Sequence, residues 1–216
     1  DANTTATGNT AFGYSSLSAN TTGDRNVAIG WSAMSVNTVG DRATALGYAA
    51  LQNQNPSSNA DTYNVAIGYN AGNAITTGTQ NTAVGALALD ANTTASNNTA
   101  IGAQALTENT TGSENVAVGM QSLDANTTGT DNTAIGVNAL GANTTASNNT
   151  AVGKNALKVN TTGDQNVAVG GLSLDANTTG IRNTAVGFEA MSANTTANNN
   201  TAFGHAAMAS NTTGEN

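Results

Sequence analysis

The sequence predicts an all-β protein, a parallel β-solenoid or β-roll of about twelve coils. One pentapeptide, Asn-(Thr/Val)-Ala-aliphatic-Gly, recurs with small variations, and its glycines are seventeen residues apart except for the longer step from Gly47 to Gly68. A short period held along the chain is typical of solenoids, in which each repeat buries its apolar side chains against its neighbours. No window of about 12 residues keeps a 3.6-residue apolar period, so helices are not expected.

The pentapeptide is the predicted strand of each coil. Counting its Asn as position 1, side chains alternate, so Val116 and Val118 share one face and Ala117 takes the other. The glycine at position 5 marks a corner, where a backbone angle unfavourable for other residues, or a close approach of another segment, is expected. The Leu or Met at position 9 returns to the interior. The residues at position 4 are expected to form a structural row, which includes Ile29, Ile67, Val84, Ile101, Val118, Ile135, Val152, Val169 and Val186.

Positions 12 to 15 of the repeat, Asn-Thr-Thr-(Gly/Ala), carry turn residues. Each triplet also matches the N-glycosylation pattern, but glycans on coils only about 4.8 Å apart would crowd one another. We therefore expect a structural ladder of Asn side chains that satisfies backbone groups of the turn; partial glycosylation in a suitable host is the alternative. This row includes Asn92, Asn109, Asn126, Asn143, Asn160, Asn177 and Asn194.

The repeats form a single predicted domain over residues 1–216. A partial coil covers residues 1–8, and complete coils follow over 9–216. An insertion around residues 52–61, with Pro56 in a polar run, is expected to loop outward. Because the sequence opens in mid-coil and carries no capping motif, we interpret it as a segment of a longer fibre. Residues 81–131 closely match 132–182, which indicates duplication of a three-coil unit.

The amino-acid composition argues against several classes of function. Charged residues make up 8% of the chain, against about 25% in ordinary domains, and the net charge is −8. A chain this acidic lacks the basic stripe that nucleic acids or anionic membranes require, so neither is an expected partner. There is no Cys, no apolar stretch of bilayer-spanning length and no paired catalytic carboxylates, and the one His, His205, lies in an aromatic row. We expect no enzyme activity, no cofactor and no metal site.

Apolar content also bears on assembly. Each coil offers few aliphatic side chains, at roughly 1.5–3 kcal/mol each when buried, against about 1–2 kcal/mol of ordering cost for each backbone residue. This deficit favours a homotrimer in which three chains share a core lined by their Val and Ile rows. A monomeric solenoid with inward Asn and Thr ladders is the alternative.

The segments Asn26-Val27-Ala28-Ile29-Gly30 with Ala33, and Asn64-Val65-Ala66-Ile67-Gly68 with Ala71, resemble the head repeats of YadA-like trimeric autotransporter adhesins. The resemblance extends over every coil. It implies a left-handed parallel β-roll, three identical chains and an extracellular, cell-surface role in attachment. Similar repeats occur in phage-type tail fibres, so the shaft of a tail fibre or injection device is the alternative. The Asn-Thr-Thr-Gly turn is an addition to the family pattern and enlarges one corner of each coil.

Position 6 carries the candidate binding residues Tyr14, Trp31, Tyr48 and Tyr69. Stacked at coil spacing, they would form an aromatic strip that binds a glycan or a host surface protein, or that simply stabilises the coil stack. A distant alternative is ice binding by the Thr rows. Two consecutive threonines in an extended segment point to opposite faces, so each face would carry one Thr file.

Overall fold

The computed structural model describes residues 2–212 and residue 214, and all regular elements within that range are β-strands. The chain divides into two compact units, Asp1–Thr111 and Gly112–Asn216. None of the described residues belongs to a helix with the length and hydropathy needed to cross a bilayer.

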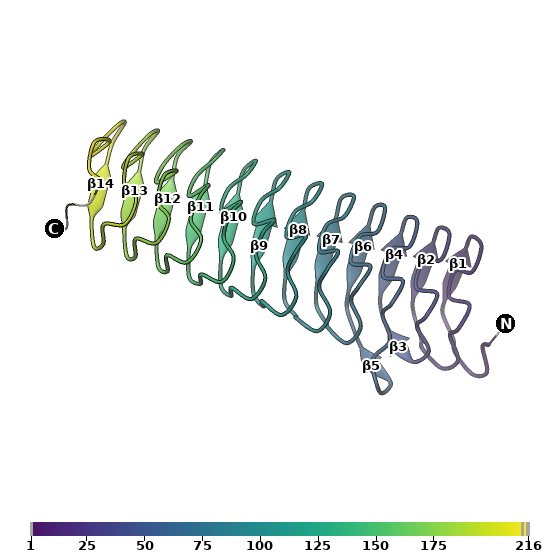
Figure 1. Ribbon diagram of the computed structural model, residues 1–216. Helices are drawn as coiled ribbons and strands as arrows, with labels where there is room; N and C mark the ends of the chain where they lie inside the picture. Colours follow the sequence, from purple (N-terminus) through teal and green to yellow (C-terminus); the bar gives the residue numbers. More distant parts are fainter. Residues whose placement is uncertain (1, 213, 215–216) are drawn as a thin grey trace. The chain divides into compact units, whose positions relative to one another are not determined.

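In both units, strands of successive coils pair in parallel, as predicted (Figure 1). The register advances by seventeen residues, as in the pairing of Thr133 with Thr150. The parallel β-solenoid and its repeat length are thus confirmed. The stacked strands of the first unit are β1 (Thr10–Phe12), β2 (Val27–Ile29), β4 (Thr44–Leu46), β6 (Val65–Ile67), β7 (Thr82–Val84) and β8 (Thr99–Ile101). Those of the second are β9 (Val116–Val118), β10 (Thr133–Ile135), β11 (Thr150–Val152), β12 (Val167–Val169), β13 (Thr184–Val186) and β14 (Thr201–Phe203).

The interior of each coil is lined by position 3 of the strand and by position 9. Ala117 and Ala134 at position 3 are fully buried, and so are Leu123 and Leu140 at position 9. The return of the Leu and Met row to the interior agrees with the sequence prediction. Position 4 points the other way, because side chains alternate along a strand; Ile135 is 40% exposed. The aliphatic row at position 4 is therefore partly exposed, and the apolar core of each coil is built mainly from Ala at position 3 and Leu or Met at position 9.

Two buried rows of Asn bridge successive coils. At position 12, the Asn143 amide donates to the Asn126 side-chain oxygen at 2.9 Å and to the carbonyl of Ala146 at 3.0 Å. At position 1, the Asn132 amide donates to the same Ala146 carbonyl at 2.8 Å, and its oxygen accepts from the backbone N–H of Asn149. Each side chain thus satisfies turn backbone while bonding an adjacent coil, which is how fully buried amides are retained in so thin a core.

The glycine corner has a steric cause. At position 5 the described glycines have φ between 123° and 141°, a region that L residues rarely adopt. A Cβ on Gly119 would lie 2.7 Å from the carbonyl carbon of Gly136 in the next coil. Backbone of adjacent coils therefore touches directly at this corner. Positive φ also occurs at positions 7, 9 and 17 in residues with side chains, as in Asn138, Leu140 and Asp131.

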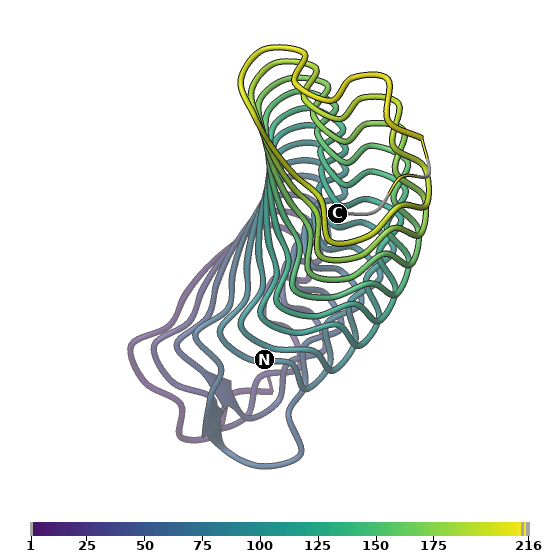
Figure 2. The ribbon, with the colours of Figure 1, turned by 90° about the vertical axis from the view of Figure 1, so that its left-hand side faces the viewer.

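The insertion adds a second short parallel pair, β3 (Gly40–Asp41) with β5 (Ala60–Asp61). The exposed part of the insertion is shorter than the segment 52–61 that the sequence predicts to loop outward. Gln54 and Pro56 are buried, whereas residues 57–59 are exposed. Figure 2 shows this excursion standing clear of the neighbouring coils.

Candidate functional site

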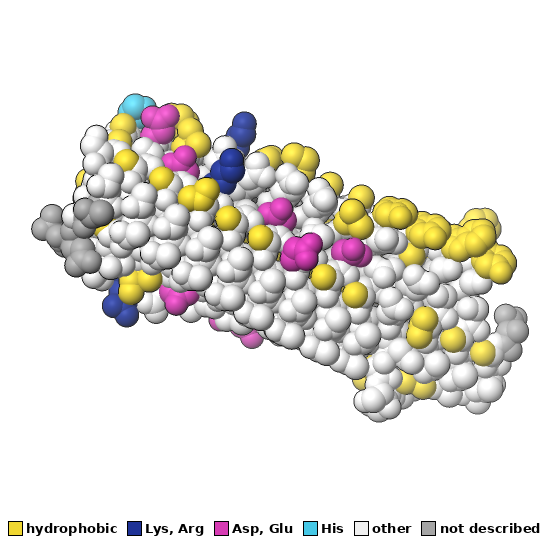
Figure 3. Space-filling view, in the orientation of Figure 1, with side chains coloured by type: hydrophobic (Ala, Val, Ile, Leu, Met, Phe, Trp, Pro, Cys, Tyr) yellow, Lys and Arg dark blue, Asp and Glu magenta, His cyan; other side chains and the backbone are white. Residues whose placement is uncertain are grey.

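The first unit carries an exposed apolar face built from positions 4 and 6 of its coils. Strand alternation turns position 4 outward, and the glycine corner then presents position 6 beside it. Hydrophobic side chains gather over these coils at the upper right of Figure 3. We call this surface the aromatic face; it comprises Phe12, Leu46 and Ile67 at position 4, with exposures of 76%, 45% and 38%, and Tyr14, Trp31, Tyr48 and Tyr69 at position 6, each at least half exposed.

The rings of the aromatic face contact one another in pairs. Tyr14 and Trp31 have ring centroids 4.4 Å apart with planes tilted by 33°, and Tyr48 and Tyr69 stack at 5.4 Å with planes 15° apart. Such pairs are worth about 0.5–1.5 kcal/mol beyond the area they bury. Because each ring turns one face toward the other ring of its pair, that partner leaves the second face, the edges and the Tyr hydroxyls uncovered.

In the second unit, position 6 carries mostly small, aliphatic or charged side chains. Among the described residues of this unit, the rings of Phe188 and His205 stack at 5.8 Å and 10°, which places His205 in an aromatic stack. The outward row at position 4 continues with Val118, Ile135, Val152, Val169 and Val186. The aliphatic row is therefore shared by both units, while the longest run of aromatic residues belongs to the first.

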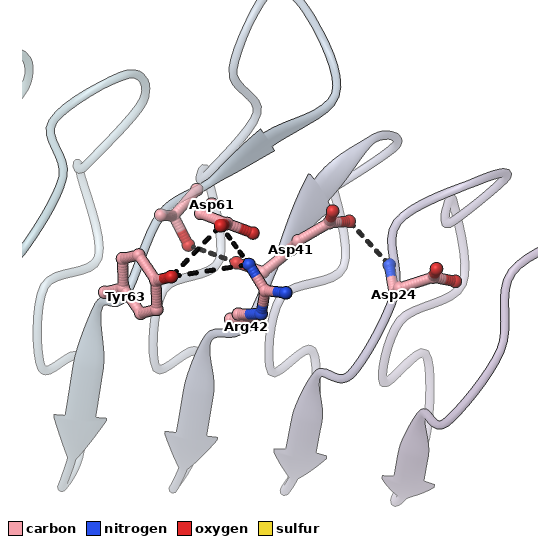
Figure 4. A network of polar contacts seen from close by, with 6 residues as sticks. Asp24, Asp41, Arg42, Asp61 and Tyr63 are labelled. Atoms are coloured by element: carbon pink, nitrogen blue, oxygen red, sulfur yellow. Dashed lines mark hydrogen bonds and ion pairs between the residues drawn. The ribbon is translucent and has the colours of Figure 1, made fainter.

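A polar cluster fixes the insertion to the preceding coil (Figure 4). Arg42 pairs with Asp61 and donates to the Tyr63 hydroxyl at 3.3 Å, and that hydroxyl donates to Asp61 at 3.0 Å. The guanidinium carbon also lies 5.8 Å from the Tyr63 ring centroid. In the same region, Asp41 accepts a hydrogen bond from the backbone N–H of Asp24 at 2.6 Å. This cluster could not be predicted from the sequence, because its partners are brought together only by the pairing of β3 with β5.

The Asp24–Asp41 contact belongs to a row at position 16 in which a side-chain oxygen accepts from the previous coil's backbone. Ser147 and Asp164 repeat it, with the Ser147 N–H at 2.7 Å from the Asp164 carboxylate. Several of the scattered Asp, Ser and Asn residues thus have a structural explanation. The recurrence of short oxygen-bearing side chains at one repeat position was the signal that could have revealed it.

The described residues contain no group of three or more His, Cys, Asp or Glu side chains placed to hold a metal ion. Burial, reinforced by nearby Glu108, raises the pKa of Asp90 above its ordinary value. Burial likewise raises the pKa of Asp175, with a smaller contribution from Glu189. An open hollow of about 230 Å³ lies where Gly141 leaves a gap between the longer side chains of Asp124 and Lys158.

The Asn residues of the Asn-Thr-Thr triplets lie inside the coils. Asn92, Asn109, Asn126, Asn143, Asn160, Asn177 and Asn194 are all fully buried. The first Thr of each triplet commonly donates its hydroxyl to the next coil, as Thr144 does to the carbonyl of Thr161 at 3.2 Å. The second, such as Thr145, is exposed.

Comparisons with protein-family models, with curated proteins and with solved structures found no match.

Proposed function

We propose that this chain is a structural and adhesive segment of an extracellular fibre at a cell surface, in which three identical left-handed β-rolls pack together and present a repetitive surface for attachment. The observation that supports this most directly is the outward aliphatic row. Coils whose apolar core is mainly Ala at position 3 and Leu or Met at position 9 leave the Val and Ile side chains of position 4 partly exposed from coil to coil, as at Ile101 and Ile135.

Energetic reasoning connects that row to self-association. Burying apolar surface contributes about 25 cal/mol per Å², and a stable interface removes large contiguous areas from water. A row repeated at each coil supplies such an area at a constant spacing. Identical chains carry the same spacing, so their rows match along the whole interface, which an unrelated globular partner would not do.

The proposed role of the aromatic face is attachment. It adds Tyr and Trp, residues enriched in protein interfaces, to the same outward surface in the first unit only. A host or surface protein is therefore the proposed ligand, and a glycan is the alternative. A tail-fibre shaft would share the coil stack and the trimer, and nothing in the geometry favours it over an adhesin. Ice binding is disfavoured, because the first Thr row uses its hydroxyls between coils.

The mass of the protein in solution tests the assembly. Light scattering should give about three times 21.3 kDa. Ile135→Lys places a charge in the aliphatic row and should shift the mass toward a single chain. Thr145→Lys places the same charge on an exposed residue of a different row and should leave the trimer intact. A wild-type mass of one chain, or equal dissociation of the two variants, would overturn the proposed interface.

Attachment is tested separately on the assembled protein. Fluorescent beads coated with the protein should bind a protein-coated surface, and replacing Trp31 and Tyr48 by Ser should lower that binding several-fold while the mass stays that of a trimer. Unchanged binding by this double variant would rule out the aromatic face as the attachment surface and leave the assembly proposal standing.

A further inference from the structure

A second set of acceptor sequences for N-linked glycans occurs at position 17, immediately before the strands. The segments are Asn97-Asn98-Thr99, Asn148-Asn149-Thr150 and Asn199-Asn200-Thr201. They match the Asn-x-Thr pattern independently of the Asn-Thr-Thr triplets. Where a strand follows, Asn occupies position 17 only if that strand has Thr at position 2; the strands that begin with Val are preceded by Arg25, Tyr63, Glu114 and Gln165.

The structure separates the two sets by exposure. Asn97, Asn148 and Asn199 are exposed, whereas Asn92, Asn143 and Asn194, in the same coils, are completely buried. Each of the three exposed residues has φ of 60° to 63°, which turns the chain into the strand and directs the side chain away from it. Their backbone N–H groups are bonded to the preceding coil, as Asn148 is to Thr130 at 3.1 Å. Their side-chain amides make no hydrogen bond to any of the described residues.

Replacing the amide proton by a sugar has opposite consequences in the two sets. In the buried set, the Asn143 amide donates two hydrogen bonds inside the ladder, to Asn126 and to Ala146. A glycan on that nitrogen would break the ladder and could not fit within the coil. At Asn148 the nitrogen faces solvent, and no bond is lost.

The distance between acceptor residues also favours glycosylation of the exposed set. Asn148 and Asn199 lie three coils apart in the second unit, which at about 4.8 Å per coil is about 14 Å. Glycans on every coil would collide, whereas this interval leaves room for a branched sugar. In the sequence, the three-coil duplication likewise separates Asn97 from Asn148 by three repeats.

We propose that Asn97, Asn148 and Asn199 are N-glycosylation sites that the folded solenoid retains, and that folding excludes glycans from the buried Asn-Thr-Thr ladder. The partner is an asparagine glycosyltransferase, and the donor is a sugar activated as a diphosphate. The Asn Nδ2 attacks the anomeric carbon, a C–N bond forms as the C–O bond to the diphosphate breaks, and the Nδ2 proton is released. Transfer occurs on the extended chain, before the strand that starts at the acceptor Thr is paired.

Co-expression with a soluble asparagine glycosyltransferase that uses a nucleotide sugar tests this inference. The enzyme is first shown to modify synthetic peptides spanning residues 95–101 and 90–96. The folded, protease-resistant fraction is then mapped by mass spectrometry. We expect glycans at the three exposed residues and at least tenfold lower occupancy at the seven fully buried Asn residues. A folded fraction that is bare at all three, or equally modified in both sets, overturns the proposal.

Substitutions that copy other coils of the repeat provide matched controls. Thr99→Val and Thr150→Val remove the acceptor hydroxyl but install the residue found at this position in Val116 and Val167, so folding is kept and occupancy should vanish. Gln80→Asn precedes Asn81-Thr82 and should gain a glycan. Gln165→Asn precedes Asn166-Val167 and should gain none. If Gln80→Asn stays bare, exposure at position 17 is not what permits modification.

Discussion

Single residues hold the coils in contact where no side chain fits between them. The glycine at position 5 combines a φ that L residues avoid with backbone contact to the next coil, so two separate constraints select the same residue. The buried Asn residues act in a comparable way, because an amide carries both the donor and the acceptor that a repeating bridge requires. Leucine at position 9 has a positive φ, which is strained for an L residue, and burial of its side chain offsets that strain.

Gly119→Ala should destabilise the second unit by at least about 1–3 kcal/mol, the usual cost of forcing a side chain into such a backbone region. The added Cβ would also meet the carbonyl of Gly136. Gly141→Ala is the matched control, because Gly141 lacks a positive φ and its Cβ would meet nothing closer than the flexible Asp124 carboxylate at 3.3 Å. Urea unfolding followed by circular dichroism measures both; equal losses would contradict the steric account.

Asp90→Asn should raise the unfolding temperature modestly at pH 7. Burial and Glu108 raise the pKa of Asp90 above 3.8 in the folded state, so the folded chain holds the proton more tightly than the unfolded chain does. Ionisation therefore costs stability as pH rises through the folded pKa, and the cost disappears below about 3.8. The effect is small because Asp90 is partly exposed.

Thermal unfolding between pH 3 and pH 7 checks this sign. The advantage of the Asn variant should shrink toward low pH, and Glu108→Gln should reproduce part of it, since Glu108 is the second cause of the shift. An advantage that stays constant with pH would mean that the substitution acts through packing instead.

At the scale of the coil, the sequence predicted what periodicity encodes and missed what depends on three-dimensional pairing. Strand, glycine corner and the inward Leu were predictable from alternation and spacing. The burial of Asn at position 1, as in Asn132, was not, because a polar residue at a strand start usually indicates a turn. The aromatic row at position 6 was predicted, but the orientation of its rings depends on side-chain torsions that no repeat pattern encodes.

The fourth coil departs from the consensus in two places that compensate each other. Position 9 carries Gly72 instead of Leu, and position 12 carries Ile75 instead of Asn. A Cβ on Gly72 would lie 3.0 Å from the Ile75 side chain and 3.1 Å from that of Leu51. The Ile side chain thus fills the volume that the missing Leu leaves.

Gly72→Leu alone should cost about 1–3 kcal/mol through overpacking, and Ile75→Asn alone about 2–5 kcal/mol through lost apolar volume. The double variant restores the consensus pair and should recover stability, with a coupling energy of about 0.5–3 kcal/mol. Chemical unfolding of the wild type, both single variants and the double variant measures the coupling. Additive losses would show that the two departures are independent.

The whole molecule combines an acidic surface with an outward apolar row, and the two oppose each other in a trimer. Each chain has a net charge of −8, so three chains together carry three times that charge. Like charges repel and weaken association, whereas burial of the aliphatic rows strengthens it. In the proposed trimer, the free energy gained by burying the aliphatic rows must therefore exceed the repulsion between the chains. Added salt screens the repulsion.

Raising the salt concentration from about 0.01 M to about 0.15 M shortens the Debye length from about 30 Å to about 8 Å, which screens the repulsion between chains. The trimer fraction at low protein concentration should therefore rise with salt, as measured by sedimentation velocity. Sucrose at matched osmolality is the control, because it strengthens apolar burial without screening charge and should have a smaller effect on the trimer fraction. Dissociation of the trimer on adding salt would mean that pairs of opposite charge hold the chains together, and the aliphatic row would then lose its proposed role.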